Sequence, residues 1–197
     1  MSDRQDRLLL GGGIGSGKTA AAVHLGALGA HVVSSDDLAR SVLEPGTRAT
    51  AQVLERWPKV GTDSGVIDRA LLGEIVFSDP ASLADLEAIT HPLVRSMIDE
   101  EVEAHPLEPI VIELPVLRDL PGRGWPWIVV DAPEELRVRR ALARGVLAEE
   151  ALRRIMSLQP SRGDWLVAAC WVIDNSGDEQ HLKEQCRSVW EEIATSD

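Results

Sequence analysis

The sequence has no tyrosine, one phenylalanine and only two cysteines among its 197 residues. Cys170 and Cys186 lack the close spacing of a metal knuckle and cannot form a disulfide framework, so we interpret both as reduced thiols. No apolar run is long enough to cross a bilayer, and the polar start MSDRQDR is not typical of a signal peptide. These absences predict a cytoplasmic protein without a membrane partner.

Positive charge is also scarce, since the net charge is -12. Proteins that follow a nucleic-acid backbone need many cations to displace its counterions, so we expect no nucleic-acid partner. The cations that exist are unevenly distributed, and one short stretch is rich in arginine. We interpret this stretch as a candidate anion clamp, formed by Arg137, Arg139, Arg140, Arg144, Arg153, Arg154 and Arg162.

The length favours one compact domain, and 44% hydrophobic with 26% charged residues is ordinary for a soluble globular protein. The chain begins with an apolar strand at residues 7–10, a glycine-rich loop, an alanine-rich helix at 17–28 and a second strand at 31–34. This order is typical of a right-handed parallel βαβ unit.

Residues 37–104 show mostly helical periodicity. Breaks are expected at 45–46, 58, 61–65 and 79–80, and His91-Pro92 is expected to start a helix. Further strands are predicted at 109–113, 127–131 and 171–174, and helices at 133–144, 148–158 and 179–193. The fold class is therefore α/β, with a mostly parallel five-stranded sheet flanked by helices.

Residues 12–19 read GGIGSGKT and satisfy GxxxxGK[ST] directly after a strand and before a helix. In this motif, a P-loop, backbone N–H groups and the helix N-terminus bind phosphates. Lys18 is expected to reach the β and γ phosphates of ATP, and the Thr19 hydroxyl to ligate Mg²⁺. The predicted nucleotide contacts are Gly13, Gly15, Ser16, Gly17, Lys18, Thr19 and Ala20.

An overlapping pattern supports a different nucleotide fold. Residues 15–20 also fit GxGxxG/A, and Asp36 lies about twenty residues further on, where a dinucleotide fold places its ribose-binding acid. That pattern does not account for Lys18 and Thr19, whereas the P-loop does. We therefore favour the P-loop.

Asp36 and Asp37 follow the second strand and so lie at the carboxyl end of the sheet, where ligands bind in open α/β folds. A carboxylate there can orient an acceptor hydroxyl and take its proton. The simpler interpretation is helix capping by Ser35 or Asp36. We favour Asp36 as the catalytic residue.

The arginines also have a simpler interpretation, because charged residues on a helix usually form a solvated face. Arg140 and Arg144 are four residues apart and share one face, so we favour these two as functional over Arg137 and Arg139. His91 is a secondary candidate that capping or core packing explains equally well. Asp131 and Glu113 end strands, and either bind Mg²⁺ through water or cap the next turn.

In order along the chain, these motifs resemble the dephospho-coenzyme A kinase family. The resemblance rests on GGIGSGKT at Gly12, LGAHVVSSDDLAR at Leu25, EPGT at Glu44, the run from Gly65 to Phe77, HPLV at His91, the Pro115-Val116-Leu117 turn, APEELRVRRALAR at Ala132, Gln159 and VIDNSG at Val172. Only the P-loop among them is generic.

The resemblance implies a kinase that transfers the γ-phosphoryl group of ATP, with Mg²⁺, to the ribose 3'-hydroxyl of dephospho-coenzyme A. It implies a core at about 1–40, 106–134 and 164–197, a helical substrate segment at about 41–105 and a lid at about 135–163, within one domain. It also implies a cytoplasmic monomer or weak homo-oligomer whose partners are these two small molecules.

The resemblance assigns roles to individual residues as well. Lys18, Asp36 and Arg140 are expected to be catalytic, with Asp36 as the general base. Arg144 and Asn175 are expected at the nucleotide, with Asn175 near the adenine. The acceptor is expected to contact Asp36, Arg69, His91, Pro115 and Leu117.

The sequence departs from the family pattern at Gly11, Ser34, Arg118-Asp119 and Cys170. Two alternatives stay open: another P-loop small-molecule or nucleotide kinase with a different acceptor, and a nucleotide-binding regulator without a phosphorylated substrate. The lid arginines and Asp36 favour phosphoryl transfer over the regulator.

Overall fold

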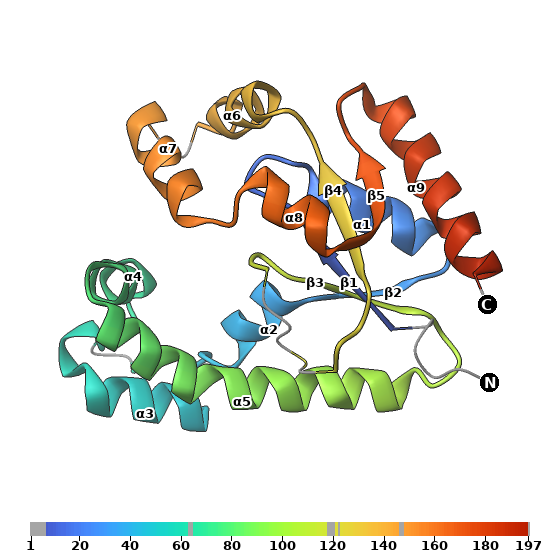
Figure 1. Ribbon diagram of the computed structural model, residues 1–197. Helices are drawn as coiled ribbons and strands as arrows, with labels where there is room; N and C mark the ends of the chain where they lie inside the picture. Colours follow the sequence, from blue (N-terminus) through green and yellow to red (C-terminus); the bar gives the residue numbers. More distant parts are fainter. Residues whose placement is uncertain (1–6, 63–64, 118–120, 122, 146–147, 197) are drawn as a thin grey trace. The chain divides into compact units, whose positions relative to one another are not determined.

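Five short strands form one sheet in the order β2-β3-β1-β4-β5, and every pairing is parallel (Figure 1). The computed structural model describes residues 7–62, 65–117, 121, 123–145 and 148–196. The strands are β1 (Arg7–Gly11), β2 (His31–Ser34), β3 (Ile110–Glu113), β4 (Trp127–Asp131) and β5 (Ala169–Asp174). The α/β class with a five-stranded sheet is confirmed.

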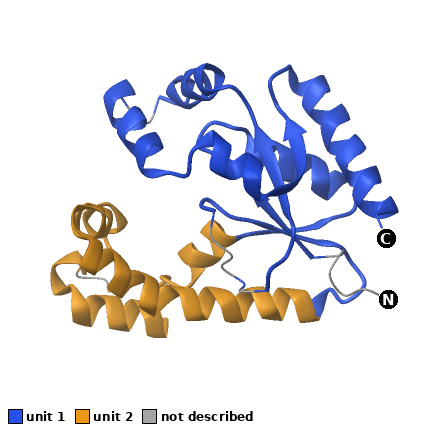
Figure 2. Ribbon diagram, in the orientation of Figure 1, with its two compact units in different colours: residues 1–34, 104–197 blue, residues 35–103 orange. Residues whose placement is uncertain are grey.

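The chain divides into two compact units (Figure 2). The first unit, Met1–Ser34 with Ala104–Asp197, holds the sheet, and the second unit is Ser35–Glu103. The helices of the first unit are α1 (Lys18–Ala27), α6 (Glu134–Ala143), α7 (Glu149–Leu158), α8 (Arg162–Ala168) and α9 (Glu179–Thr195). The segment predicted as a lid thus lies in the same unit as the sheet.

The core of the first unit follows from the alternation of side chains along buried strands. Leu8 and Leu10 of β1 point to one face, where α1 and α9 pack side by side and contribute Leu25 and Val189. A smaller cluster joins α6 to α7 through Val138 and Leu152.

Three strands end at the same edge of the sheet. In the register of the parallel pairs, Glu113 of β3 lies beside Leu10 of β1 on one side and Ser34 of β2 on the other. Whatever follows these strands is therefore brought to one edge, the usual place of ligands in such sheets.

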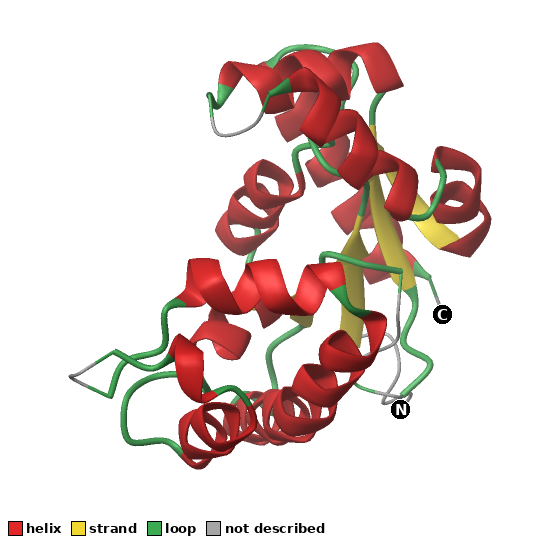
Figure 3. Ribbon diagram, turned by 90° about the vertical axis from the view of Figure 1, so that its left-hand side faces the viewer, coloured by secondary structure: helices red, strands yellow, loops and turns green. Residues whose placement is uncertain are grey.

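The second unit is helical (Figure 3). It contains α2 (Ser35–Ser41), α3 (Arg48–Arg56), the 3-10 turn Pro58–Val60, α4 (Arg69–Ser78) and most of α5 (Pro80–Ala104). Val53, Trp57 and Leu72 belong to its buried cluster. The predicted breaks at 45–46 and 79–80 are confirmed.

The prediction that a helix begins at His91-Pro92 is wrong, because α5 runs through Pro92. A proline inside a helix leaves the carbonyl four residues earlier without its N–H donor. Here that residue is Ala88, which is exposed, as is Pro92, so water can bond the freed carbonyl. On the opposite side Thr90 and Val94 are buried and hold the helix in place.

Helix α8 was not predicted. Ser161 accepts a hydrogen bond from the Asp164 backbone N–H, and the Asp164 carboxylate accepts one from the Ser161 N–H, which together form a capping box. Trp165, 2% exposed, anchors the helix against β4. No helix in the described part of the chain has the length and apolar character needed to span a membrane.

Candidate active site

The P-loop joins the end of β1 to the start of α1, as predicted, and its path depends on glycine at two positions. Gly15 has φ 77° and Gly17 has φ 98°, both in the left-handed region. A Cβ on Gly15 would lie 2.2 Å from the carbonyl oxygen of Arg137, and one on Gly17 would lie 2.1 Å from Asn175 Nδ2. The loop is therefore in close contact with segments far along the chain.

Asn175 supports the loop from the end of β5. Its side chain is 5% exposed, and its Nδ2 donates a 2.7 Å hydrogen bond to the carbonyl oxygen of Ser16. Arg140 in turn donates to the carbonyl oxygens of Asn175, at 2.8 Å, and Gly177, at 3.2 Å. In this conformation Arg140 and Asn175 thus brace the loop and the turn beside it.

A pocket of about 580 Å³ opens at this end of the loop. Gly15, Gly17, Arg140, Arg144 and Asn175 all line it. The structure thus brings Arg140, predicted as catalytic, together with five of the predicted nucleotide residues: Gly15, Gly17, Ala20, Arg144 and Asn175. The size suits a nucleoside.

Glu113 and Asp131, the carboxylates at the ends of β3 and β4, have different partners. The Thr19 hydroxyl donates to Glu113 Oε1 at 3.3 Å, so a pair of hard oxygen ligands of the kind Mg²⁺ prefers stands at the first turn of α1. Asp131 instead binds the Arg162 guanidinium through both oxygens, at 2.8 Å and 2.6 Å. Of the two alternatives, Glu113 therefore fits a metal-binding role better.

The opposite flank of the loop is held by a glutamine. Gln159 Oε1 accepts a 3.0 Å hydrogen bond from the backbone N–H of Ile14, whose side chain packs on the α6–α7 cluster. Arg137 lies buried against Gly13, whereas Arg139 is exposed. The simpler interpretation, a solvated face, is therefore wrong for Arg137, and its spacing of three residues from Arg140 gave no sign of the contact with Gly13.

The glycine at position 11, a departure from the family pattern, has a local cause. A Cβ there would lie 2.3 Å from Cζ3 of Trp165 and 2.8 Å from Cζ3 of Trp127. The two indole rings, 5.8 Å apart and edge to face, occupy the space that a larger residue would fill.

The predicted acceptor residues occupy different parts of the chain. Asp36 is exposed in the first turn of α2, and Arg69 at the start of α4 donates to Glu44 Oε1 at 3.1 Å. These two and His91 belong to the second unit. Pro115 and Leu117 follow β3 in the first unit, whereas Arg118 and Asp119 lie outside the described residues.

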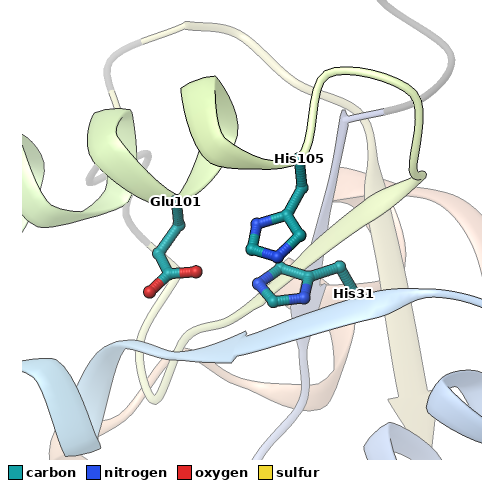
Figure 4. A group of neighbouring side chains, drawn as sticks. All are labelled: His31, Glu101 and His105. Carbon is teal, nitrogen blue, oxygen red and sulfur yellow. The ribbon is translucent and has the colours of Figure 1, made fainter.

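A pair of histidines lies at the other end of the sheet. His31 at the start of β2 and His105 stack with ring centroids 3.6 Å apart and planes 19° apart, and Glu101 precedes His105 by one helical turn (Figure 4). The lone pairs of stacked rings lie in nearly parallel planes, so they do not converge on one ion without ring rotation. In this arrangement the histidine pair is not a preformed metal centre.

Comparisons with known proteins agree on one family. The family model for dephospho-CoA kinase matches residues 8–181. A dephospho-CoA kinase of Thermobifida fusca is 41% identical over 188 residues, covering 93% of this chain and 94% of the relative.

Two solved structures agree in fold. A Thermus thermophilus protein has a TM-score of 0.83 and 32% identity, covering 94% of this chain and 96% of the other. The dephospho-CoA kinase of Campylobacter jejuni, at 24% identity, has a TM-score of 0.71 and covers 95% and 96%. By the extent of these matches, the chain belongs to the dephospho-CoA kinase family.

Proposed function

We propose that this chain transfers the γ-phosphoryl group of ATP to the ribose 3'-hydroxyl of dephospho-coenzyme A. Family membership supports the reaction and the identity of the acceptor. The observation that carries the phosphate half of the proposal is the P-loop at the edge of the sheet, with Asn175 and Gln159 bonded to its two flanks.

The nucleotide binds along this loop. The adenosine occupies the 580 Å³ pocket, between Arg144 and the turn that Arg140 holds against Gly177. The phosphates follow the backbone N–H groups to the start of α1, where Lys18 supplies a positive charge. Asn175 acts by holding the Ser16 carbonyl, so it positions the loop as well as facing the nucleoside.

Mg²⁺ is the metal this site would take. Thr19 and Glu113 would hold it, because their oxygens already lie 3.3 Å apart beside the phosphate loop. The ion, when bound, neutralises negative charge that develops on the phosphates.

The residues that we propose for acceptor binding belong to the second unit and to the segment after β3. Asp36 orients the attacking hydroxyl and receives its proton, while Arg69, His91, Pro115 and Leu117 contact the rest of the acceptor. The carboxyl end of β2 supports this role for Asp36, because β2 ends at Ser34 and Ser34 lies in register with Glu113.

The direct test is product formation. The protein, MgATP and dephospho-coenzyme A are incubated together, and coenzyme A and ADP are measured by chromatography. We expect both products in equal amounts. ADP without coenzyme A, or ADP release stimulated only by another acceptor, would contradict the proposed acceptor and favour a different kinase.

We further propose that the protein works in the cytoplasm as a monomer or weak homo-oligomer. Both proposed substrates are small molecules, which supports this proposal. Sedimentation at several protein concentrations measures the oligomeric state.

A further inference from the structure

A buried cation lies directly against the P-loop. The Arg137 side chain of α6 is 7% exposed, and its guanidinium faces Gly13. A Cβ placed on Gly13 would lie 2.6 Å from Arg137 Nη1 and 2.8 Å from its Cζ. The backbone carbonyl of the same residue touches Gly15. Arg137 therefore contacts the loop through both its side chain and its backbone.

The charge of Arg137 is incompletely compensated. Its Nε is buried and has no hydrogen-bond partner among the described residues. Asp131 is close enough to favour the cation, but both its oxygens bind Arg162, and Glu134 is exposed. Burial lowers the pKa of the Arg137 guanidinium, against the influence of Glu134 and Asp131. A buried cation of this kind destabilises a protein unless an anion accompanies it.

The position of Arg137 indicates which anion that is. The proposed nucleoside pocket adjoins Gly15 and Gly17 at one end of the loop. A second pocket, of about 370 Å³, is lined by Gln159 and by the cations Arg137, Arg153 and Arg162, which outnumber its carboxylate Glu134. Gln159 bonds the Ile14 N–H, so this pocket adjoins the Gly13–Ile14 end of the loop. A nucleotide whose base lies at the first end directs its terminal phosphate toward the second.

We propose that Arg137 is a positioning residue for the terminal phosphate of the nucleotide and makes the site prefer ATP to ADP. This inference rests on the proposed binding of ATP. Without nucleotide, Glu134 and Asp131 compensate the Arg137 charge only in part, and its buried Nε has no hydrogen-bond partner in the described part of the chain. With a triphosphate bound, the γ-phosphate supplies a further anionic partner. The charge then stabilises the loaded loop more strongly than the empty one.

The test compares nucleotide affinities without any acceptor. A non-hydrolysable ATP analogue and ADP, each with Mg²⁺, are titrated calorimetrically into the wild type, Arg137→Met and Arg137→Lys. We expect Arg137→Met to lower affinity for the ATP analogue about tenfold or more, and for ADP less than about threefold. Arg137→Lys keeps a charge, so its ratio of the two affinities should stay within about threefold of the wild type.

Arg139→Met is the matched control, because Arg139 is an exposed neighbour on the same helix. It should leave both affinities unchanged. Thermal unfolding without nucleotide separates function from structure: replacing an unpaired buried charge by an apolar chain should keep or raise the melting temperature of Arg137→Met. If that variant fails to fold, Arg137→Gln serves as the neutral variant, with the same loss of ATP preference expected.

Equal losses for the ATP analogue and ADP would overturn the inference. A loss in Arg137→Lys as large as in Arg137→Met, or a lower melting temperature with an unchanged affinity ratio, would also overturn it. Since no acceptor is present, these outcomes are independent of the coenzyme A assay. A wild type that prefers ATP but makes no coenzyme A would refute the proposed acceptor alone.

Discussion

Asn175 and Arg137 lie so close to the P-loop that they leave no room for side chains at some of its positions. The loop contains two glycines, Gly13 and Gly15, at positions that its motif leaves unrestricted, and both contact Arg137. Gly17, which the motif requires, contacts the Asn175 amide. The glycine content of this loop therefore reflects its neighbours as well as phosphate binding.

Gly11 is also a glycine with close side-chain neighbours, although it lies before the loop. Gly11→Thr should lower the free energy of unfolding by about 1–3 kcal/mol, because the new side chain overlaps Trp165 and Trp127. Urea denaturation measures this change in the free energy of unfolding. Trp165→Ala alone should also destabilise, since it leaves a cavity of ring size.

The double variant is the control for this prediction. If the overlap with Trp165 is the cause, Gly11→Thr together with Trp165→Ala should cost less than the sum of the single changes. Strict additivity would mean that Gly11 is required for another reason.

Asp36 is the residue whose chemical role is most directly testable. Asp36→Asn should bind ATP normally and lose turnover by about 10²-fold or more, as expected for a general base. Steady-state assays and calorimetry measure the two quantities. Asp37→Asn is the control, because Asp37 is also exposed in the first turn of α2 and pairs with Arg40 at 2.7 Å. A larger loss in Asp37→Asn would transfer the role to Asp37.

At the scale of elements, helix α5 contains a residue that lowers its stability. Pro92 lies in its interior and is exposed. Pro92→Ala restores one backbone hydrogen bond and should raise the free energy of unfolding by about 2 kcal/mol. The penalty of proline in a helix is about 3 kcal/mol, and greater freedom of the unfolded chain offsets up to about 1 kcal/mol. Chemical denaturation measures the gain.

Ser96→Ala is the control for this change, because Ser96 is another exposed residue of α5. Its effect should stay within about 0.5 kcal/mol. A less stable Pro92→Ala protein would show that the proline ring, rather than the packing of Thr90 and Val94, holds the helix together.

Short buried strands and the P-loop could be predicted from sequence, because alternation, chain breaks and the motif are local signals. Strands β2 and β4 match their predicted ranges, and the others differ by at most two residues at an end. Helix α8 was missed because Pro160 and Gly163 are breaking signals, whereas Trp165 is held by β4, far away in the sequence. The burial of Arg137 depends on Gly13, so no local pattern predicted it.

At the scale of the molecule, the two cysteines report on folding. Cys186 is fully buried in the main core, and burial raises the pKa of its thiol to about 11. Cys170 is exposed. Because the thiolate is the reactive form, the native protein should react with a charged thiol reagent at one site and the unfolded protein at two.

Cys170→Ser is the control and should not react until it unfolds; rapid reaction of its native form would contradict the burial of Cys186.

The raised pKa of Cys186 also determines how the stability of the protein changes with pH. Above about pH 8.5 the unfolded thiol ionises, whereas the folded thiol keeps its proton up to about pH 11. Cys186 therefore makes the protein less stable as the pH rises through this range.

The contacts of the P-loop have a consequence for biosynthesis. Residues 12–19 leave the ribosome early, yet the side chains that hold them, Arg137, Gln159 and Asn175, are translated more than a hundred residues later. Pairings so distant in sequence form slowly and late. A nascent chain therefore carries its phosphate motif through most of translation without a formed phosphate site, and becomes competent to bind nucleotide only when its last quarter has emerged.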